Sequence, residues 1–219
     1  MGLCLEVSGE FACFTRPEMR VERVSYDVVT PSAARNIFQA ILWKPSIEWQ
    51  IDRIEVLNPI RWMNIRRNEV GAVISGNQVR RVMEKGRGRL QLFVEKDRQQ
   101  RSSLILRDVC YRIYSHFNLT AKASSDETPE KFLAMFLRRA RKGQCFRQPY
   151  LGCKEFFADF RLIEPDQPDA ETIVETKDLG WMFYDYDYSE EPPSPRFFRA
   201  EMNNGVLHIP PSDSSEIRG

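Results

Sequence analysis

Two short amphipathic helices, each opened by a Thr-Pro pair, constrain the fold of this chain more than any other feature. Thr30 is a good N-cap residue, and the proline after it takes the first helical position, where a missing N–H has no intrahelical partner. An apolar stripe with the 3.6-residue period of a helix follows, and Pro45 ends it. A second helix is expected between Thr128, which is again followed by proline, and Gly143.

Segments with the alternating pattern of β-strands surround both helices. They cover residues 2–8, 47–57, 89–95, 102–119 and 151–163. The alternation slips at Asp52-Arg53, which predicts a β-bulge. The basic stretch at residues 61–88 predicts an irregular, mobile loop. Coarsely, and with a hairpin in place of the usual crossover between the middle strands, strands and helices follow the order β-α-β-β-α-β, which predicts a ferredoxin-like (RRM-like) domain over residues 1–163.

The last quarter of the chain differs in charge and pattern. Residues 1–163 hold 28 Lys and Arg against 18 Asp and Glu, a balance of +10, whereas residues 164–219 hold 4 against 13, a balance of −9. The acidic, proline-containing start of this second part predicts a linker. Three alternating segments follow, two of them flanking the turn signal Asn204-Gly205, so we expect a small antiparallel β domain. The tail after Pro211 is expected to be disordered, and the fold class is α+β.

The basic region suits a polyanion partner, because Lys and Arg that bind phosphates release condensed counterions. Solvated faces of an ordinary domain would give the same charge balance. The sequence has no long apolar run and no leader-like N-terminus, so we expect no membrane span and a cytoplasmic location. Five cysteines without a C-x-x-C pair indicate reduced, buried thiols rather than disulfides or a zinc site.

The sequence lacks the common phosphate-loop, zinc-protease, serine-hydrolase and dinucleotide signatures. Its acidic residues do not cluster as metal ligands, so we expect no metal and no cofactor. Cleavage of RNA without metal requires a proton acceptor, a proton donor and a cation around an activated 2′-hydroxyl. His116 is a candidate for proton transfer, and the strand face that carries it is a candidate RNA-binding surface. The alternatives are a structural role for His116 and a polar face that meets solvent or the C-terminal domain. His208 is expected to be structural or exposed.

Four long stretches of the sequence are distinctive. They are ACFTRPEMRVERVSYDVVTPSAARNIFQAILWKP, IDRIEVLNPIRWMNIRRNEVG, RRARKGQCFRQPYLGCKEF and DLGWMFYDYDY. In this order they resemble the CRISPR-associated Cas5d family of type I-C systems, in the RAMP superfamily, over nearly the whole chain. The resemblance implies a ferredoxin-like domain with a small C-terminal β domain. It also implies metal-independent cleavage of precursor CRISPR RNA (pre-crRNA) within the repeat, and retention on the 5′ handle of the guide (crRNA) in the type I-C Cascade complex.

The family's catalytic residues carry over only in part. Leu42 stands where the family has the first tyrosine of its Tyr-Trp/Tyr-Lys-Pro motif, here Leu42-Trp43-Lys44-Pro45, and Phe132 replaces the histidine that follows Lys131. We therefore expect an endoribonuclease with Lys131 as the cation and His116 or a nearby tyrosine for proton transfer. The alternative is a non-catalytic subunit that binds the crRNA handle. A generic RNA-binding regulator is a third hypothesis, which a preference for the CRISPR repeat hairpin would exclude.

The residues expected to contact RNA are basic or aromatic and lie in or near these stretches. They are Arg16, Arg20, Arg23, Tyr26, Trp43, Lys44, Arg66, Arg67, Arg138 and Arg139. The arginines would contact phosphates, and Trp43 would stack on a base. Cations near the end of the second helix also interact favourably with its dipole, so Arg138 and Arg139 have a structural role as the alternative to RNA binding. Expected partners are the CRISPR repeat RNA, the crRNA 5′ handle, other type I-C Cascade subunits and double-stranded DNA.

Overall fold

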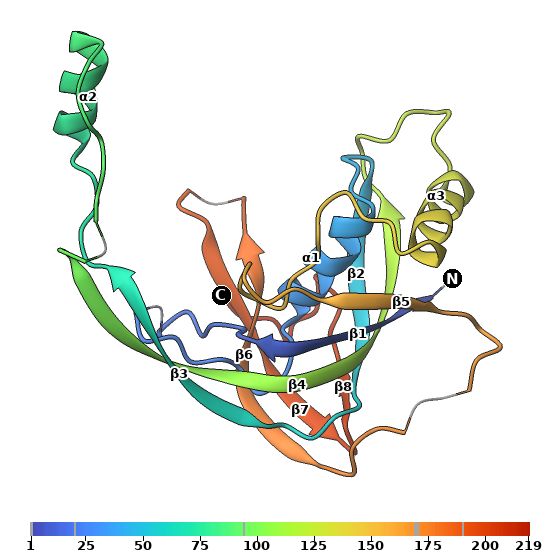
Figure 1. Cartoon of the computed structure of the whole chain (residues 1–219). Coiled ribbons are helices and arrows are strands. Elements are labelled where there is room, and N and C mark those ends of the chain that lie inside the picture. Colours follow the sequence, from blue (N-terminus) through green and yellow to red (C-terminus); the bar gives the residue numbers. More distant parts are fainter. Residues whose placement is uncertain (1, 20, 94, 169–170, 190) are drawn as a thin grey trace.

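A single antiparallel sheet organises the chain (Figure 1), and the computed structural model describes residues 2–19, 21–93, 95–168, 171–189 and 191–219 of it. The strands are β1 (Leu3–Ala12), β2 (Ile47–Val56), β3 (Trp62–Val70), β4 (Arg98–Leu119), β5 (Asp159–Ile163), β6 (Lys177–Asp187), β7 (Ser194–Asn203) and β8 (Val206–His208). Their order is β5-β1-β4-β2-β8-β7-β6, with β3 paired to β4 outside this path. The helices are α1 (Pro31–Ile41), α2 (Gly76–Lys85) and α3 (Pro129–Arg141).

The two predicted helices are confirmed, together with their caps. The Thr30 and Thr128 side chains each accept a hydrogen bond from the backbone N–H three residues on, at 3.4 Å, and Gly143 has the left-handed φ of +61° expected beyond a helix end. The predicted β-bulge is also present, because the register between β2 and β4 shifts between Ile51 and Arg53. Local sequence signals were therefore sufficient for these elements.

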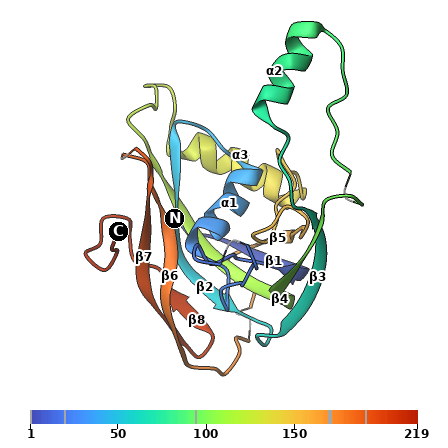
Figure 2. The same ribbon diagram turned by 90° about the vertical axis from the view of Figure 1, so that its left-hand side faces the viewer.

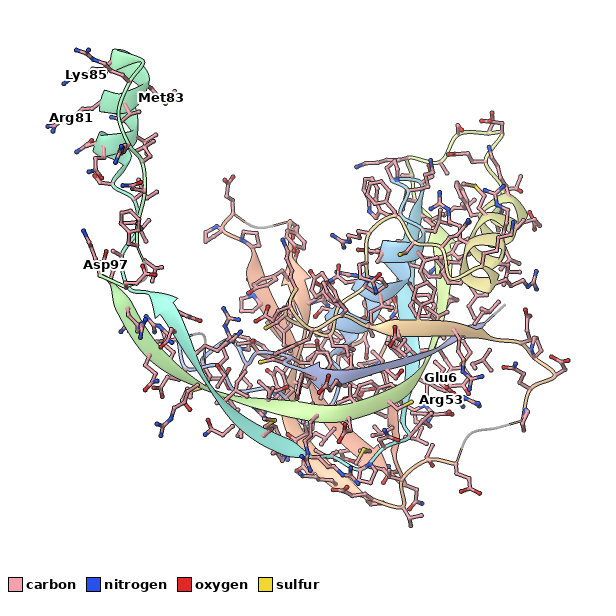
Figure 3. All side chains as sticks on the ribbon, in the orientation of Figure 1. Glu6, Arg53, Arg81, Met83, Lys85 and Asp97 are labelled. Carbon is pink, nitrogen blue, oxygen red and sulfur yellow. The ribbon has the colours of Figure 1, made fainter. Side chains whose placement is uncertain are left out.

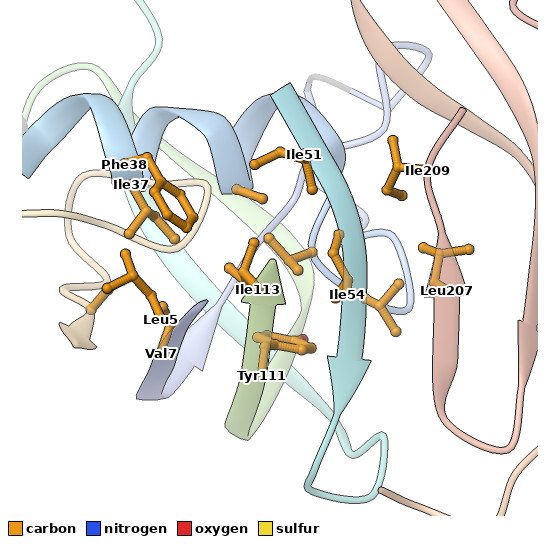
Figure 4. Close-up of a cluster of buried hydrophobic side chains, with 14 of the residues drawn as sticks. Leu5, Val7, Ile37, Phe38, Ile51, Ile54, Tyr111, Ile113, Leu207 and Ile209 are labelled. Atoms are coloured by element: carbon orange, nitrogen blue, oxygen red, sulfur yellow. The ribbon is translucent and has the colours of Figure 1, made fainter. Parts of the chain in front are cut away.

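The main core lies between one face of the sheet and helices α1 and α3. Figure 4 shows the part of it beside α1. Leu5 from β1, Ile113 from β4 and Phe38 from α1 are fully buried in it. Leu207 of β8 belongs to the same core, because β8 pairs with β2 and extends the sheet. The basic and the acidic regions of the chain thus share one sheet and one core.

The tail was expected to be disordered, but it lies along the edge of the C-terminal strands. Phe197 of β7 exchanges two backbone hydrogen bonds with Arg218, at 2.6 and 2.8 Å. The Arg196 guanidinium also donates to the Ser212 carbonyl at 2.7 Å. These bonds hold the last residues against β7.

The predicted irregular loop at residues 61–88 is wrong, because it contains β3 and α2. The two strands β3 and β4 form a long ribbon whose tip carries α2 away from the body of the protein (Figures 1 and 2). No residue of α2 is buried, and Arg81, Met83 and Lys85 point outward from it (Figure 3). The strands expected at residues 89–95 and 151–158 are also absent among the described residues, since β4 begins at Arg98 and β5 at Asp159.

None of the helices in the described residues is long and apolar enough to cross a membrane.

Candidate functional site

The C-terminal end of α1 is held by bonds to three other parts of the chain. The last carbonyls of a helix have no intrahelical donors and need other partners. The Ala40 carbonyl accepts from the backbone N–H of Phe146 at 2.7 Å, and the Ile41 carbonyl accepts from Arg139 at 2.7 Å. The Leu42 carbonyl accepts from the Trp49 indole at 2.9 Å. The segment after α1 therefore has a fixed position relative to α3 and to the loop that follows α3.

Residues 43–46 and 120–131 meet at one end of the sheet, and we call this region the loop corner. Thr120 joins the two segments, because its hydroxyl donates to the Pro45 carbonyl at 2.7 Å and its N–H donates to the Ser46 carbonyl at 3.0 Å. Lys44 and Lys131 are both exposed here. The structure thus brings the Trp-Lys-Pro segment and the start of α3 together, although they are far apart in the sequence.

The charges of the loop corner are balanced by short local contacts. The Lys131 ammonium lies 3.8 Å from Asp126, and its side chain is 48% exposed. Hydrogen bonds from the Ser46 hydroxyl and then from the Ser124 N–H lower the pKa of Glu127, and a bond from the Ser124 hydroxyl lowers that of Asp126. Lys131 is therefore oriented by a carboxylate but open to a ligand.

The two positions that depart from the family pattern are buried. Leu42 and Phe132 both have no exposed surface and belong to the main core. Next to them, the Phe136 ring stacks on Phe38 at 5.7 Å and contacts Trp49 at 4.9 Å. These side chains fasten α3 to α1 and β2, so here both positions serve packing rather than proton transfer.

His116 lies on the other face of the sheet from Lys131. Phe117 contacts Trp49 edge-on at 5.2 Å and so faces the helices, and successive side chains of a strand point to opposite faces. The His116 Nδ1 lies 2.8 Å from the Asp52 carboxylate at the β-bulge. The structure therefore does not bring together the two residues that we expected to share catalysis.

The sheet face that carries His116 is a paired polar network. The Arg53 guanidinium lies 3.9 Å from the centre of the Tyr114 ring and 3.0 Å from Glu55. Arg112 has only 7% of its side chain exposed, and donates to Glu6 at 3.2 Å and to the Pro168 carbonyl at 3.0 Å. The alternative expectation, that this face meets another part of the chain, therefore holds for Arg112.

The basic segment before α1 is largely engaged with the protein itself. Tyr26 is 1% exposed and its hydroxyl accepts from the Phe183 N–H at 3.2 Å, so its ring is not available to a base. Arg16 lies 4.4 Å from the centre of that ring and 3.3 Å from Asp27, with 26% of its side chain exposed. Arg20 lies outside the described residues.

Arg23 and Arg67 converge on one acidic residue, Glu155. Arg67 forms an ion pair with its carboxylate, and Arg23 lies 3.7 Å from it. Arg23 also donates to the Cys153 thiol at 3.5 Å. Hydrogen bonding with Cys13, followed by the Arg23 charge, lowers the pKa of Cys153 below its ordinary value. Both arginines therefore have structural contacts that an RNA phosphate would have to replace or share.

The remaining predicted contacts divide into exposed and structural groups. Trp43 is 61% exposed, and Lys44, Arg66 and Arg138 are also exposed. Arg139 instead donates to the end of α1, as described above. Arg66 lies on the ribbon of β3 and β4, whereas the other three exposed residues lie near the loop corner or on α3.

Three residues that the sequence did not single out lie beside Trp43. Gln39, Phe146 and Arg147 line a surface hollow of about 240 Å³ with it. Phe146 is 83% exposed, which is unusual for a large apolar side chain. The available sequence signal for this hollow was the pair Phe146-Arg147, an aromatic residue next to an arginine in a polar loop.

The described residues contain no group of three or more His, Cys, Asp or Glu side chains that could hold a metal ion.

Comparisons with known proteins agree on one family. The profile of the CRISPR-associated protein (Cas_Cas5) family, in its Cas5d form, matches residues 2–210. A protein of Mannheimia succiniciproducens named CRISPR pre-crRNA endoribonuclease Cas5d is 51% identical over 98% of this chain and 97% of its own. A protein of the same name from Thermus thermophilus is 38% identical over 98% of this chain and 94% of its own. The crystal structure of a CRISPR-associated protein superposes with a TM-score of 0.71 at 25% identity, covering 100% of this chain and 97% of that one.

Proposed function

Because the chain belongs to the CRISPR-associated Cas5d family, we propose that it binds the repeat hairpin of pre-crRNA, cleaves it, and remains on the 5′ handle as a Cascade subunit. The observation that carries the proposal is full-length similarity to two proteins named pre-crRNA endoribonucleases. Its partners are then the CRISPR repeat RNA and the other subunits of the type I-C complex.

A ferredoxin-like unit is the fold that we propose for the RNA-binding part of the chain. The strands β5-β1-β4-β2 are adjacent in this order, with α1 and α3 in the connections on one face. This order supports a ferredoxin-like unit, an architecture that RNA-binding proteins use, to which β8, β7 and β6 add the C-terminal part.

The loop corner is the best-supported place for the reaction. In cleavage without metal, the 2′-hydroxyl loses a proton and attacks the adjacent phosphorus, and the 5′-oxygen of the next nucleotide leaves and gains a proton. Negative charge develops on the non-bridging oxygens, and a nearby ammonium stabilises it. Lys131 is oriented by Asp126 and open to solvent, which suits this role.

Proton transfer is where this chain departs from its family. Residues 43–46 and 120–131 contain no histidine and no tyrosine. A general base works best when its pKa lies near the pH of the reaction, and the lowered pKa of Glu127 makes it a weak one. Lys44, exposed on the opposite segment of the corner, is a cation that suits phosphate binding, so the corner supplies charge stabilisation rather than a general base.

This departure favours a second candidate function, a handle-binding subunit that does not cut RNA. The specific observation is that Leu42 and Phe132 are both fully buried. The basic surface around α3 would then serve binding alone.

The experiment uses the repeat hairpin and the same hairpin with a 2′-deoxynucleotide at the scissile position. We expect cleavage of the all-RNA hairpin at one site, to a 2′,3′-cyclic phosphate, and no cleavage of the deoxy form, although both bind equally. An unrelated hairpin of equal length is the specificity control. Equal binding of the unrelated hairpin would contradict the proposal, and specific binding without cleavage would establish the second candidate.

A further inference from the structure

The hollow beside the loop corner has two exposed aromatic walls. Trp43 comes from the segment after α1, and Phe146 comes from the loop after α3. Their exposed fractions, 61% and 83%, leave both rings accessible. Gln39 and Arg147 complete the lining of this hollow, which measures about 240 Å³.

The walls of the hollow are fixed by backbone bonds rather than by the rings themselves. The N–H groups of Phe146 and Arg147 both donate to the Ala40 carbonyl, at 2.7 and 3.3 Å. The Gln144 N–H donates to the Arg139 carbonyl at 2.9 Å, and the Gln148 side chain donates to the Ala158 carbonyl at 3.0 Å. The loop is thus tied on both sides of Phe146, so its ring is exposed without being part of a free segment.

The chemistry of the lining matches one nucleotide of a single strand. Exposed aromatic rings stack on unpaired bases, and a side-chain amide offers both a donor and an acceptor to a base edge. A guanidinium binds phosphate in a bidentate manner. Residues 131–147, which include Phe146 and Arg147, hold six Lys and Arg and no Asp or Glu. Two of these cations, Lys131 and Arg141, pair with carboxylates, and the net charge that the other four leave still attracts a polyanion.

We propose that this hollow binds one unpaired nucleotide of the repeat RNA, next to the bond that the loop corner cuts. The base stacks against Phe146 and Trp43, Gln39 contacts its edge, and Arg147 holds the adjacent phosphate. The proposal rests on the function proposed above and adds to it a subsite that reads one single-stranded base outside the hairpin stem.

The test pairs protein variants with abasic RNA. Repeat RNAs that carry one abasic nucleotide at each unpaired position near the cleavage site are titrated against the wild-type protein and against Phe146→Ala. In the wild type, one abasic position should weaken binding about tenfold, as expected for the loss of one base–aromatic stack. In Phe146→Ala, the intact RNA should bind about tenfold more weakly, and the same abasic position should cause a much smaller loss than in the wild type, because only Trp43 is left to stack on the base.

Phe157→Ala is the matched control, because Phe157 is 66% exposed but does not line the hollow. It should keep the abasic pattern of the wild type. Phe146→Ala is expected to fold, since the side chain is mostly in solvent, and Gln39→Ala offers a second variant that should reduce discrimination between the four bases at the same position.

Two results would overturn the subsite. An abasic pattern that is the same in Phe146→Ala and in the wild type would show that no base stacks there. Unchanged RNA affinity with weaker assembly of the complex would show that the hollow contacts a protein. In both cases the wild type would still bind and cut the repeat RNA. Failure of the proposed function looks different, because the wild type would then show no preference for the repeat hairpin. The subsite proposal would fail together with it.

Discussion

Replacing Phe132 by histidine would supply the residue that the resemblance to the family implies at this position, but we expect it to destabilise the protein. Phe132 is fully buried in the main core. The variant gives up part of the roughly 1.5–3 kcal/mol that burial of a phenylalanine contributes. It also buries an imidazole N–H without a partner, which costs about 1–3 kcal/mol. Together these effects should lower the free energy of unfolding by about 3 kcal/mol, or the Tm by about 6–12 °C for a chain of this size.

The pH dependence of this variant has a definite sign. Burial disfavours the charged imidazolium and lowers the pKa of the histidine below its unfolded value of about 6.5. The unfolded state then binds more protons than the folded state below that pH, so the free energy of unfolding falls further as the pH is lowered. Differential scanning calorimetry between pH 5 and pH 8 measures both effects, and Phe132→Leu is the control that should lack the pH-dependent part. A histidine variant with the wild-type Tm at pH 8 and a faster cleavage rate would refute the reasoning.

Three further variants test the structure around the site. Phe136→Ala should lower the free energy of unfolding, measured by urea denaturation, by about 3–5 kcal/mol, because the Phe136 ring packs on Phe38 and Trp49. A loss below about 1 kcal/mol would contradict this packing. Ser46→Ala should raise the pKa of Glu127 in an NMR titration, since it removes a hydrogen bond to the carboxylate, and an unchanged pKa would disprove that bond. Arg138→Ala should reduce the salt slope of repeat-RNA binding by about one and leave the Tm unchanged, because Arg138 is assigned to a phosphate contact. Arg139→Ala should instead lower the Tm, because Arg139 holds the end of α1. The reverse pattern would contradict both roles.

Local signals in the sequence predicted the elements that build the core. The helix caps at Thr30 and Thr128 and the bulge at Asp52-Arg53 are each specified by a few neighbouring residues, so one sequence sufficed. The ribbon of β3 and β4 could not be predicted in this way. No residue of β3 is buried, so this strand lacks the apolar alternation that indicates a strand, whereas the part of β4 from residue 102 onward has buried residues and was predicted.

The candidate site was predicted less completely than the fold. The resemblance to the family named Lys44 and Lys131 as site residues, and the structure places the segments that carry them at one end of the sheet, which no local pattern predicted. His116 was paired with Lys131 on the basis of residue type alone, and sequence does not show which strand face the helices cover. The hollow around Phe146 depends on hydrogen bonds between a loop and the end of α1, for which the sequence has no periodic signal.

Cleavage of the cognate repeat RNA in EDTA by the wild type, Lys131→Ala and Lys122→Ala tests the central claim most directly. Lys122 is the matched control, an exposed lysine in the same loop. We expect the wild type and Lys122→Ala to cut at one site without metal, and Lys131→Ala to bind the RNA but cut it about 10²–10³-fold more slowly, as for loss of one charge-stabilising donor. Equal cleavage rates for all three proteins, or cleavage that requires a divalent metal, would contradict the account.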